Sequence, residues 1–181
     1  MGYVRSPLPQ DGYNIKQMAV RQNPLVSRRI AMLNLAGLTQ IASGAPVRSS
    51  KLTGKTIQGE TLDQSTLKGR PVLVQFWATW CTFCQSDEGA VEAIVNKFSP
   101  KGLVVVAVNA YEPRQKVQEY LVKHPRACKI ALLEETNLAP LLTGRNYPVY
   151  ILYDRTGNPI GEQRGASGES SLRRFIQRAG L

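Results

Sequence analysis

The feature that most constrains the fold is an apolar run that ends just before two closely spaced cysteines. Residues 72–77 read Val-Leu-Val-Gln-Phe-Trp, which is the pattern of a buried strand, and Cys81 and Cys84 follow after a short turn. Residues 82–98 then place apolar side chains at helical spacing, at Val91, Ile94, Val95 and Phe98. The sequence therefore predicts a strand, a turn and a helix, with both cysteines at the start of the helix.

This arrangement gives the two thiols different chemistry. Cys81 would lie at the N-terminus of the predicted helix, where unpaired backbone N–H groups and the helix dipole stabilise an anion. Because the thiolate is the reactive form of cysteine, we expect Cys81 to be the attacking thiol. Cys84, one turn further along, would be the buried thiol that resolves a mixed disulfide and releases the reduced partner.

The spacing alone also allows a metal site, because a Cys-x-x-Cys pair supplies half of the ligands of a structural zinc. The other candidate ligands are His124 and Cys128, which are four residues apart. A metallochaperone or metal-binding module that uses Cys81 and Cys84, with or without His124 and Cys128, is therefore the alternative to a redox enzyme. Cys128 otherwise fits a small buried hydrophobic residue or a thiol that pairs with another chain.

The rest of the chain predicts an α/β domain. A short hairpin is expected over 52–62. Further strands are expected at 103–108, 129–133, 149–153 and 159–163, and further helices at 113–123, 137–142 and 167–179. Because strands alternate with helices first and a hairpin follows, the sheet should be mixed, with parallel and antiparallel pairs.

The net charge of +10 is concentrated in the first third of the 181-residue chain. Residues 1–55 hold eight Lys and Arg against one acid, Asp11, whereas residues 56–181 hold 15 Lys and Arg against 12 acids. The body is therefore close to balanced, and it shows no basic stripe interleaved with aromatic residues. These features predict no nucleic-acid partner.

Residues 1–46 are expected to form a leader, and residues 47–181 the folded domain. Arg28 and Arg29 precede a weakly apolar segment, 30–42, that ends in small residues, which is the order of an export signal. We therefore expect an exported, periplasmic protein. A short amphipathic helix in a cytoplasmic protein and an organelle transit peptide are the alternatives. The sequence contains no run of about 18 apolar residues, so it predicts no strong transmembrane helix and gives little support for a membrane tether.

Residues 72–84, VLVQFWATWCTFC, resemble the active-site segment of the thioredoxin superfamily. Gly54-Lys55, the segment 67–71 and the segment 147–157 are similar to the TlpA/ResA branch, and the resemblance covers about residues 50–180. It implies a thioredoxin-like fold, a mixed central sheet flanked by helices, with an N-terminal hairpin and a strand–helix insertion between residues 103 and 144. It also implies thiol–disulfide exchange with protein partners and an upstream redox partner, without a bound cofactor or metal.

The resemblance also identifies residues of the substrate groove. It implies a cis peptide bond before Pro148, which would place Tyr147 beside Cys81. Trp80, next to Cys81, is expected to border the surface that meets the substrate, whereas Trp77 is expected in the core. A thiol peroxidase fits less well, because its reactive cysteine lacks an immediate Cys-x-x-Cys partner.

The chain departs from the pattern of the superfamily at three positions. Phe83 replaces a proline often found before the second cysteine, Tyr147 is bulkier than the residue usual before the cis-proline, and Gln75 stands where thioredoxin carries a buried aspartate. We therefore expect Asp87, on the apolar side of the helix one turn beyond Cys84, to be the buried proton acceptor. Members of the TlpA/ResA branch often carry Glu at this position. The alternative is a surface acid stabilised by the helix dipole.

Overall fold

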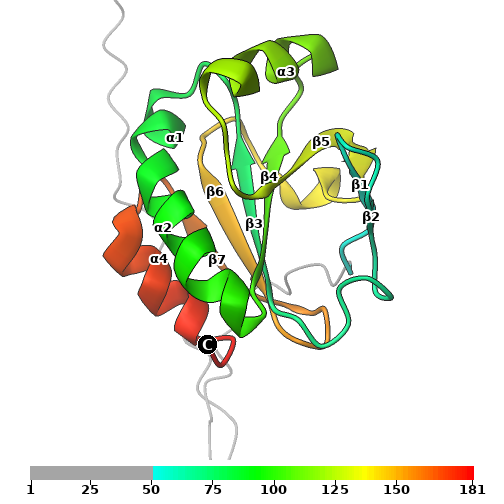
Figure 1. Cartoon of the computed structure of the whole chain (residues 1–181), viewed down its shortest axis with the longest axis vertical. Coiled ribbons are helices and arrows are strands. Elements are labelled where there is room, and N and C mark those ends of the chain that lie inside the picture. Colours follow the sequence, from blue (N-terminus) through cyan, green and yellow to red (C-terminus); the bar gives the residue numbers. More distant parts are fainter. Residues whose placement is uncertain (1–50) are drawn as a thin grey trace, which may run out of the picture. The chain divides into compact units, whose positions relative to one another are not determined.

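The computed structural model describes residues 51–181, which are coloured in Figure 1. The predicted leader, 1–46, lies outside these residues. None of the helices between residues 51 and 181 is both long and apolar enough to cross a membrane.

The order of elements follows the predicted alternation closely. The strands are β1 (Gly54–Thr56), β2 (Thr61–Leu62), β3 (Val72–Trp77), β4 (Val104–Asn109), β5 (Lys129–Thr136), β6 (Val149–Tyr153) and β7 (Pro159–Arg164). The α-helices are α1 (Thr82–Ser86), α2 (Glu88–Phe98), α3 (Arg114–Lys123) and α4 (Gly168–Gln177), and two 3-10 turns, η1 (Ser99–Lys101) and η2 (Ala139–Leu141), complete the set described for residues 51–181.

The strands form one mixed sheet in the order β2-β1-β5-β4-β3-β6-β7. At its centre, β3 pairs in parallel with β4 and antiparallel with β6, so Trp77 lies opposite Asn109, and Phe76 opposite Val149. The predicted hairpin of β1 and β2 is confirmed, and it extends the sheet through β5. The segment between residues 103 and 144 supplies β4, α3, β5 and η2. The thioredoxin-like fold predicted from the resemblance is confirmed.

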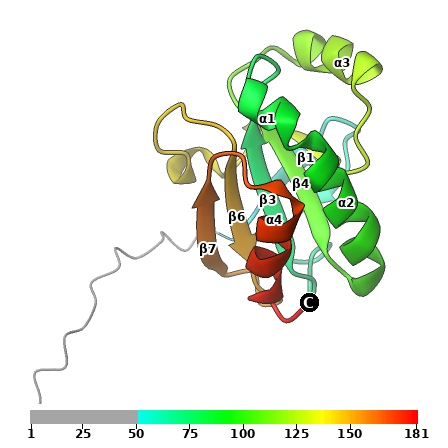
Figure 2. The ribbon, with the colours of Figure 1, turned by 90° about the vertical axis from the view of Figure 1, so that its left-hand side faces the viewer.

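The two faces of the sheet carry separate cores, because side chains alternate along each strand. Leu73, Val105 and Leu152 face α2 and α4, whose apolar stripes complete one cluster. Val74, Phe76 and Ile151 face the other side, where they pack with Val117 of α3 and with the hairpin. Figures 1 and 2 show α2 and α4 side by side over the first face, with α1 at the end of the sheet where β3 ends.

The prediction of one continuous helix over 82–98 was wrong, because the helix is interrupted at Asp87. The backbone of Asp87 adopts φ −92° and ψ −3°, and its N–H donates to the carbonyls of Cys84 and Gln85 as α1 ends. The side chain of Asp87 is bonded to β6 and to the start of α4, which holds the residue at this junction. The predicted helix over 137–142 is also shorter, a 3-10 turn over Ala139–Leu141 that contains Pro140.

Candidate active site

Cys81 and Cys84 form a disulfide at the start of α1, with their Cα atoms 5.2 Å apart. Cys81 is the N-cap residue of α1, and its Sγ and its carbonyl oxygen accept hydrogen bonds from the N–H of Cys84, at 3.1 and 3.0 Å. The predicted position of Cys81 at a helix N-terminus is confirmed. Both residues are buried, Cys81 at 5% exposure and Cys84 at 1%, so the expected contrast in exposure is small in the disulfide form.

The turn before Cys81 is held by a buried glutamate. Glu112, which follows β4, accepts hydrogen bonds from the N–H of Thr79 (2.6 Å), the hydroxyl of Thr79 (2.7 Å) and the amide of Asn109 (2.9 Å), and pairs with Lys116 (2.7 Å). Burial raises the pKa of Glu112, but hydrogen bonds from Lys116, Thr79 and Asn109 outweigh burial and lower the pKa to about 2. Glu112 therefore fixes the backbone two residues before Cys81 as an ionised carboxylate.

The cis peptide bond predicted before Pro148 is present and leads into β6. Tyr147 is buried, and its ring meets the ring of Trp80 edge-on, with 5.8 Å between the ring centroids. Burial, together with the nearby Tyr111, raises the pKa of the Tyr147 hydroxyl. The structure therefore brings together Trp80, Cys81 and Tyr147 as the sequence predicted.

These residues line an open groove of about 620 Å³ that reaches Cys81. The described residues that line the groove are Trp80, Cys81, Thr82, Phe83, Arg145, Asn146, Tyr147, Gly165 and Ala166. Trp80 is 57% exposed and Phe83 is 66% exposed, whereas Trp77 is fully buried as expected. Phe83, the replacement for the usual proline, thus adds an exposed aromatic ring beside the attacking position.

Asp87 lies on the inner side of the disulfide rather than in the groove. The residue is 3% exposed, so it is not the surface acid of the alternative interpretation. Its carboxylate accepts hydrogen bonds from the hydroxyl of Tyr150 (2.8 Å) and from the N–H groups of Ser167 (2.7 Å) and Gly168 (2.9 Å). The last two donors are the N-terminus of α4, which favours a negative charge. The role of Asp87 as proton acceptor for Cys84 stays a prediction.

The sequence did not indicate Glu112 as a site residue, nor did it indicate the buried polar partners of Gln75. Gln75 is fully buried and donates to the hydroxyl of Tyr150 (3.1 Å), while its carbonyl oxygen accepts from Arg126 (3.3 Å). The one available signal was that Gln75 interrupts an otherwise apolar strand, so a buried partner was required. Nothing local marks Tyr150 or Arg126 as that partner.

The alternative metal site is not assembled in the described part of the chain. Within residues 51–181, no group of three or more His, Cys, Asp and Glu side chains is placed to hold a metal ion. The ring of His124 stacks on Tyr120 with 4.3 Å between centroids, and its Nδ1 is 3.9 Å from a carboxylate oxygen of Glu88. Cys128 is partly buried, and burial raises the pKa of its thiol.

The amino-acid sequence is similar to those of known thiol–disulfide exchange proteins. Residues 44–172 match the AhpC/TSA family. A thiol:disulfide interchange protein DsbE from Vibrio cholerae is 31% identical over 146 residues, which cover 71% of this chain and 77% of the relative. A thiol-disulfide oxidoreductase ResA from Halalkalibacterium halodurans is 25% identical over 121 residues, 67% of this chain and 69% of the relative.

Solved structures with the same fold include a thioredoxin-family thiol:disulfide interchange protein from Chlorobium tepidum. It superposes with a TM-score of 0.59 at 22% identity, covering 72% of this chain and 92% of that one. StoA from Bacillus subtilis superposes with a TM-score of 0.58 at 19% identity, covering 68% of this chain and 95% of that one. At these identities, the structures establish a shared fold.

Proposed function

The chain belongs to the AhpC/TSA family, and from this premise we propose that it is a thiol-disulfide oxidoreductase that exchanges its Cys81–Cys84 pair with protein partners. The observation that carries the proposal is the position of Cys81: it caps α1, is bonded to Cys84, and lines an open groove. Relatives over most of the chain are named as thiol-disulfide oxidoreductases and interchange proteins.

In the reductive direction, the thiolate of Cys81 attacks one sulfur of a partner disulfide, and the other partner sulfur leaves as a thiolate. Cys84 then loses its proton and attacks the Sγ of Cys81, which releases the second partner sulfur. Two electrons pass to the partner, which takes up two protons, and the chain returns to the Cys81–Cys84 disulfide. An upstream dithiol partner restores the reduced pair, and the same steps in reverse oxidise a partner.

The groove is proposed to hold the partner segment that carries the reacting sulfur. Trp80 and Phe83 offer exposed apolar surface beside Cys81, and Tyr147, which precedes the cis-proline Pro148, also lines the groove. Proline has no backbone N–H, and the carbonyl of Pro148 accepts from the N–H of Gly165 (2.8 Å), so we expect the backbone groups of Tyr147 to pair with an extended partner.

We propose that the protein acts outside the cytoplasm, on the basis of the Arg28-Arg29 pair and the apolar segment that follows. Cell fractionation with mass determination of the mature N-terminus tests this proposal. A shortened chain in the periplasmic fraction is expected. Only full-length chain in the cytosol would contradict export and would leave the redox function untouched.

The redox function is tested by reduction of insulin with dithiothreitol, with zinc and copper titrations of the reduced protein in parallel. We expect the full chain to accelerate insulin precipitation and the double variant Cys81→Ser/Cys84→Ser to match the blank. Absence of acceleration, together with stoichiometric metal binding that the double variant loses, would support the metal-binding alternative instead.

A further inference from the structure

A continuous line of hydrogen bonds runs behind the disulfide from Arg126 to Asp87. Arg126 donates to Gln75, Gln75 donates to Tyr150, and Tyr150 donates to Asp87, over distances of 3.3, 3.1 and 2.8 Å. The four residues come from the loop before β5, from β3, from β6 and from the α1–α2 junction. Because they are far apart in the sequence, only the folded sheet assembles the line.

The chemistry of the two ends fixes the direction of every bond. A guanidinium can only donate, so the amide oxygen of Gln75 must face Arg126 and its NH₂ must face Tyr150. The hydroxyl of Tyr150 accepts that bond, and its own O–H donates a hydrogen bond to a carboxylate oxygen of Asp87. Burial and the Asp87 carboxylate raise the pKa of Tyr150, so its hydroxyl keeps this proton.

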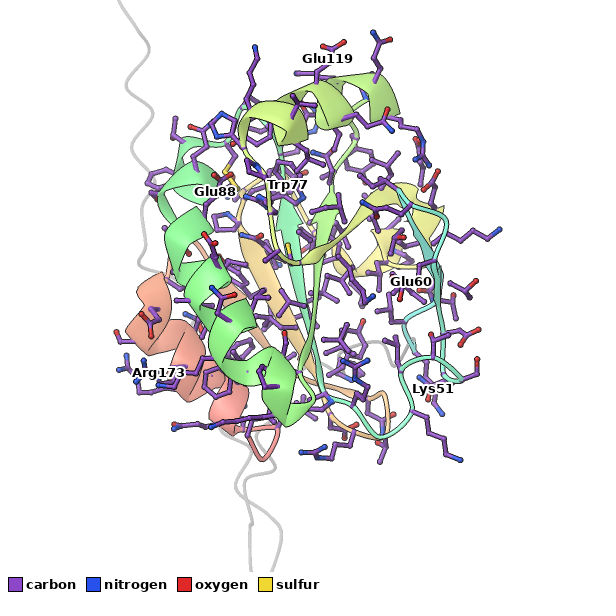
Figure 3. The ribbon with its side chains drawn as sticks, viewed as in Figure 1. Lys51, Glu60, Trp77, Glu88, Glu119 and Arg173 are labelled. Carbon is purple, nitrogen blue, oxygen red and sulfur yellow. A yellow bond between two sulfur atoms is a disulfide. The ribbon has the colours of Figure 1, made fainter. Side chains whose placement is uncertain are left out.

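The Arg126 end is anchored as a buried cation. Its side chain is 6% exposed, pairs with Glu88 at 2.7 Å, and lies over the Trp77 ring with 4.2 Å between the guanidinium carbon and the ring centroid. Figure 3 labels Trp77 and Glu88 at the end of the sheet that carries α1. The positive charge lies at one end, and every donor points toward Asp87 at the other, so the hydrogen bonds polarise one another along the line.

We propose that Arg126, Gln75 and Tyr150 are positioning residues of the redox site, which hold the Asp87 side chain in place after Cys84 and thereby set the equilibrium between the dithiol and the disulfide. This inference rests on the proposed thiol–disulfide exchange. Asp87 lies one turn beyond Cys84, and its N–H donates to the Cys84 carbonyl at 3.2 Å. A fixed negative charge there disfavours the Cys84 thiolate, and so makes the reduced pair a stronger reductant.

Several charged or ionisable groups lie on the surrounding elements. They are Cys81, which caps α1, Cys84 of α1, Glu88 of α2, Arg126 before β5, Tyr150 of β6, and Glu169 of α4, which pairs with Arg173. Variants that remove a hydroxyl without altering any of these charges therefore give the clearest test.

Strand β6 supplies a matched pair for this purpose. Tyr150 and Tyr153 are both fully buried, and both become phenylalanine by loss of one oxygen. The Tyr150 hydroxyl bridges Gln75 and Asp87, whereas the Tyr153 hydroxyl has no hydrogen-bond partner within residues 51–181. Tyr150→Phe therefore breaks the line, and Tyr153→Phe removes the same atom without breaking it.

The experiment measures the redox equilibrium constant of the full-length protein with glutathione at pH 7. We expect Asp87→Asn to shift the equilibrium toward the dithiol by about tenfold, because the negative charge near Cys84 is removed. Tyr150→Phe should shift it in the same direction by about threefold, because the Asp87 side chain is no longer held in place. Tyr153→Phe should superimpose on wild type. Gln75→Met should shift the equilibrium in the same direction by less, and it decides the matter if Tyr150→Phe is not folded by near-ultraviolet circular dichroism.

Two failures are distinguishable. If wild type shows no redox equilibrium with glutathione, the proposed function fails. If wild type equilibrates normally while Tyr150→Phe and Gln75→Met both superimpose on Tyr153→Phe, the redox function stands and the positioning role is overturned.

Discussion

The two sides of the Cys81–Cys84 disulfide differ in polarity and in exposure. The groove side presents the exposed rings of Trp80 and Phe83, with Tyr147 behind them. The inner side is fully buried, yet it is polar, with Asp87 joined through Tyr150 to Gln75. Two surfaces of one sulfur pair thus offer separate means of control: the groove can select partners, and the buried side can set the chemistry of the thiols.

A buried polar cluster is expensive unless every member is bonded, because lone polar groups lose their water without replacement. The inner side meets this condition for the Asp87 carboxylate, which has three donors. The groove side has no such requirement, since its groups remain open to solvent and to a partner. We therefore expect changes in the groove to alter rates with proteins, and changes behind the disulfide to alter stability and redox equilibrium.

The largest expected effect is at the sulfur atoms, which belong to both sides. Cys81→Ser should abolish insulin reduction, because the attacking thiolate is lost. Cys84→Ser should instead accumulate mixed disulfides with natural partners, because the resolving thiol is lost. Non-reducing gels and mass spectrometry of captured adducts measure this difference. Capture by Cys81→Ser but not by Cys84→Ser would reverse the two assignments.

The second effect concerns Glu112, which supports the turn before Cys81 from the interior. Its pKa, about 2, lies below the value of 4.5 expected when unfolded, so its stabilisation is present above pH 4.5 and is lost as the pH falls toward 2. Glu112→Gln should lower the free energy of unfolding at pH 7 by about 2 kcal/mol. This loss is smaller than the lowered pKa of Glu112 alone implies, because Lys116 is exposed and solvent screens its ion pair with Glu112.

Urea unfolding at pH 7 and at pH 3 measures this effect, and the difference between Glu112→Gln and wild type should narrow at the lower pH. Glu119→Gln, on the exposed side of α3 in Figure 3, is the control for loss of a carboxylate and should change stability little. Equal losses for the two variants at pH 7 would show that the hydrogen bonds of Glu112 to Thr79 and Asn109 contribute no stability.

Most of the fold was predictable because it follows from local patterns. The apolar runs of β3 and β4 and the helical stripe of α2 each indicate their own structure, and the positions of Cys81 and Tyr147 follow from the motifs around them. The break at Asp87 was not predictable in this way. It is held by bonds to Tyr150 and to the start of α4, more than 60 residues away in the chain.

The residues that sequence reasoning missed share this long-range character. Glu112 is 33 residues from Thr79, and it resembles any acid before a surface helix. Tyr150 lies in an apolar strand and looks like an ordinary core aromatic, and Arg126 looks like a loop charge. Their partners become visible only when β3, β6 and the loop before β5 are placed together.

The third prediction concerns recognition in the groove. Trp80→Ala should lower kcat/KM for a protein disulfide by about tenfold, because a large exposed ring next to the reacting sulfur is lost. The equilibrium with glutathione should stay unchanged, since glutathione is too small to need this surface. Val122→Ala, an exposed apolar residue on α3, is the control and should leave both quantities unchanged. A change in the glutathione equilibrium for Trp80→Ala would contradict the expectation that the groove side affects only rates with proteins and the buried side the redox equilibrium.

The smallest expected effect is electrostatic. Of the described residues that line the groove, Arg145 alone carries a full charge, and it is exposed. A partner segment with acidic residues near its cysteine should therefore react faster than a neutral segment at low ionic strength. We expect Arg145→Ala to reduce that advantage by about threefold at low salt and to have no effect at about 1 M salt, where charges separated by more than about 3 Å are screened. Rates with matched acidic and neutral disulfide peptides measure the effect, with Lys97→Ala on α2 as the control. A loss that persists at high salt would mean that Arg145 acts by contact in the groove, so recognition there would depend on shape rather than on charge.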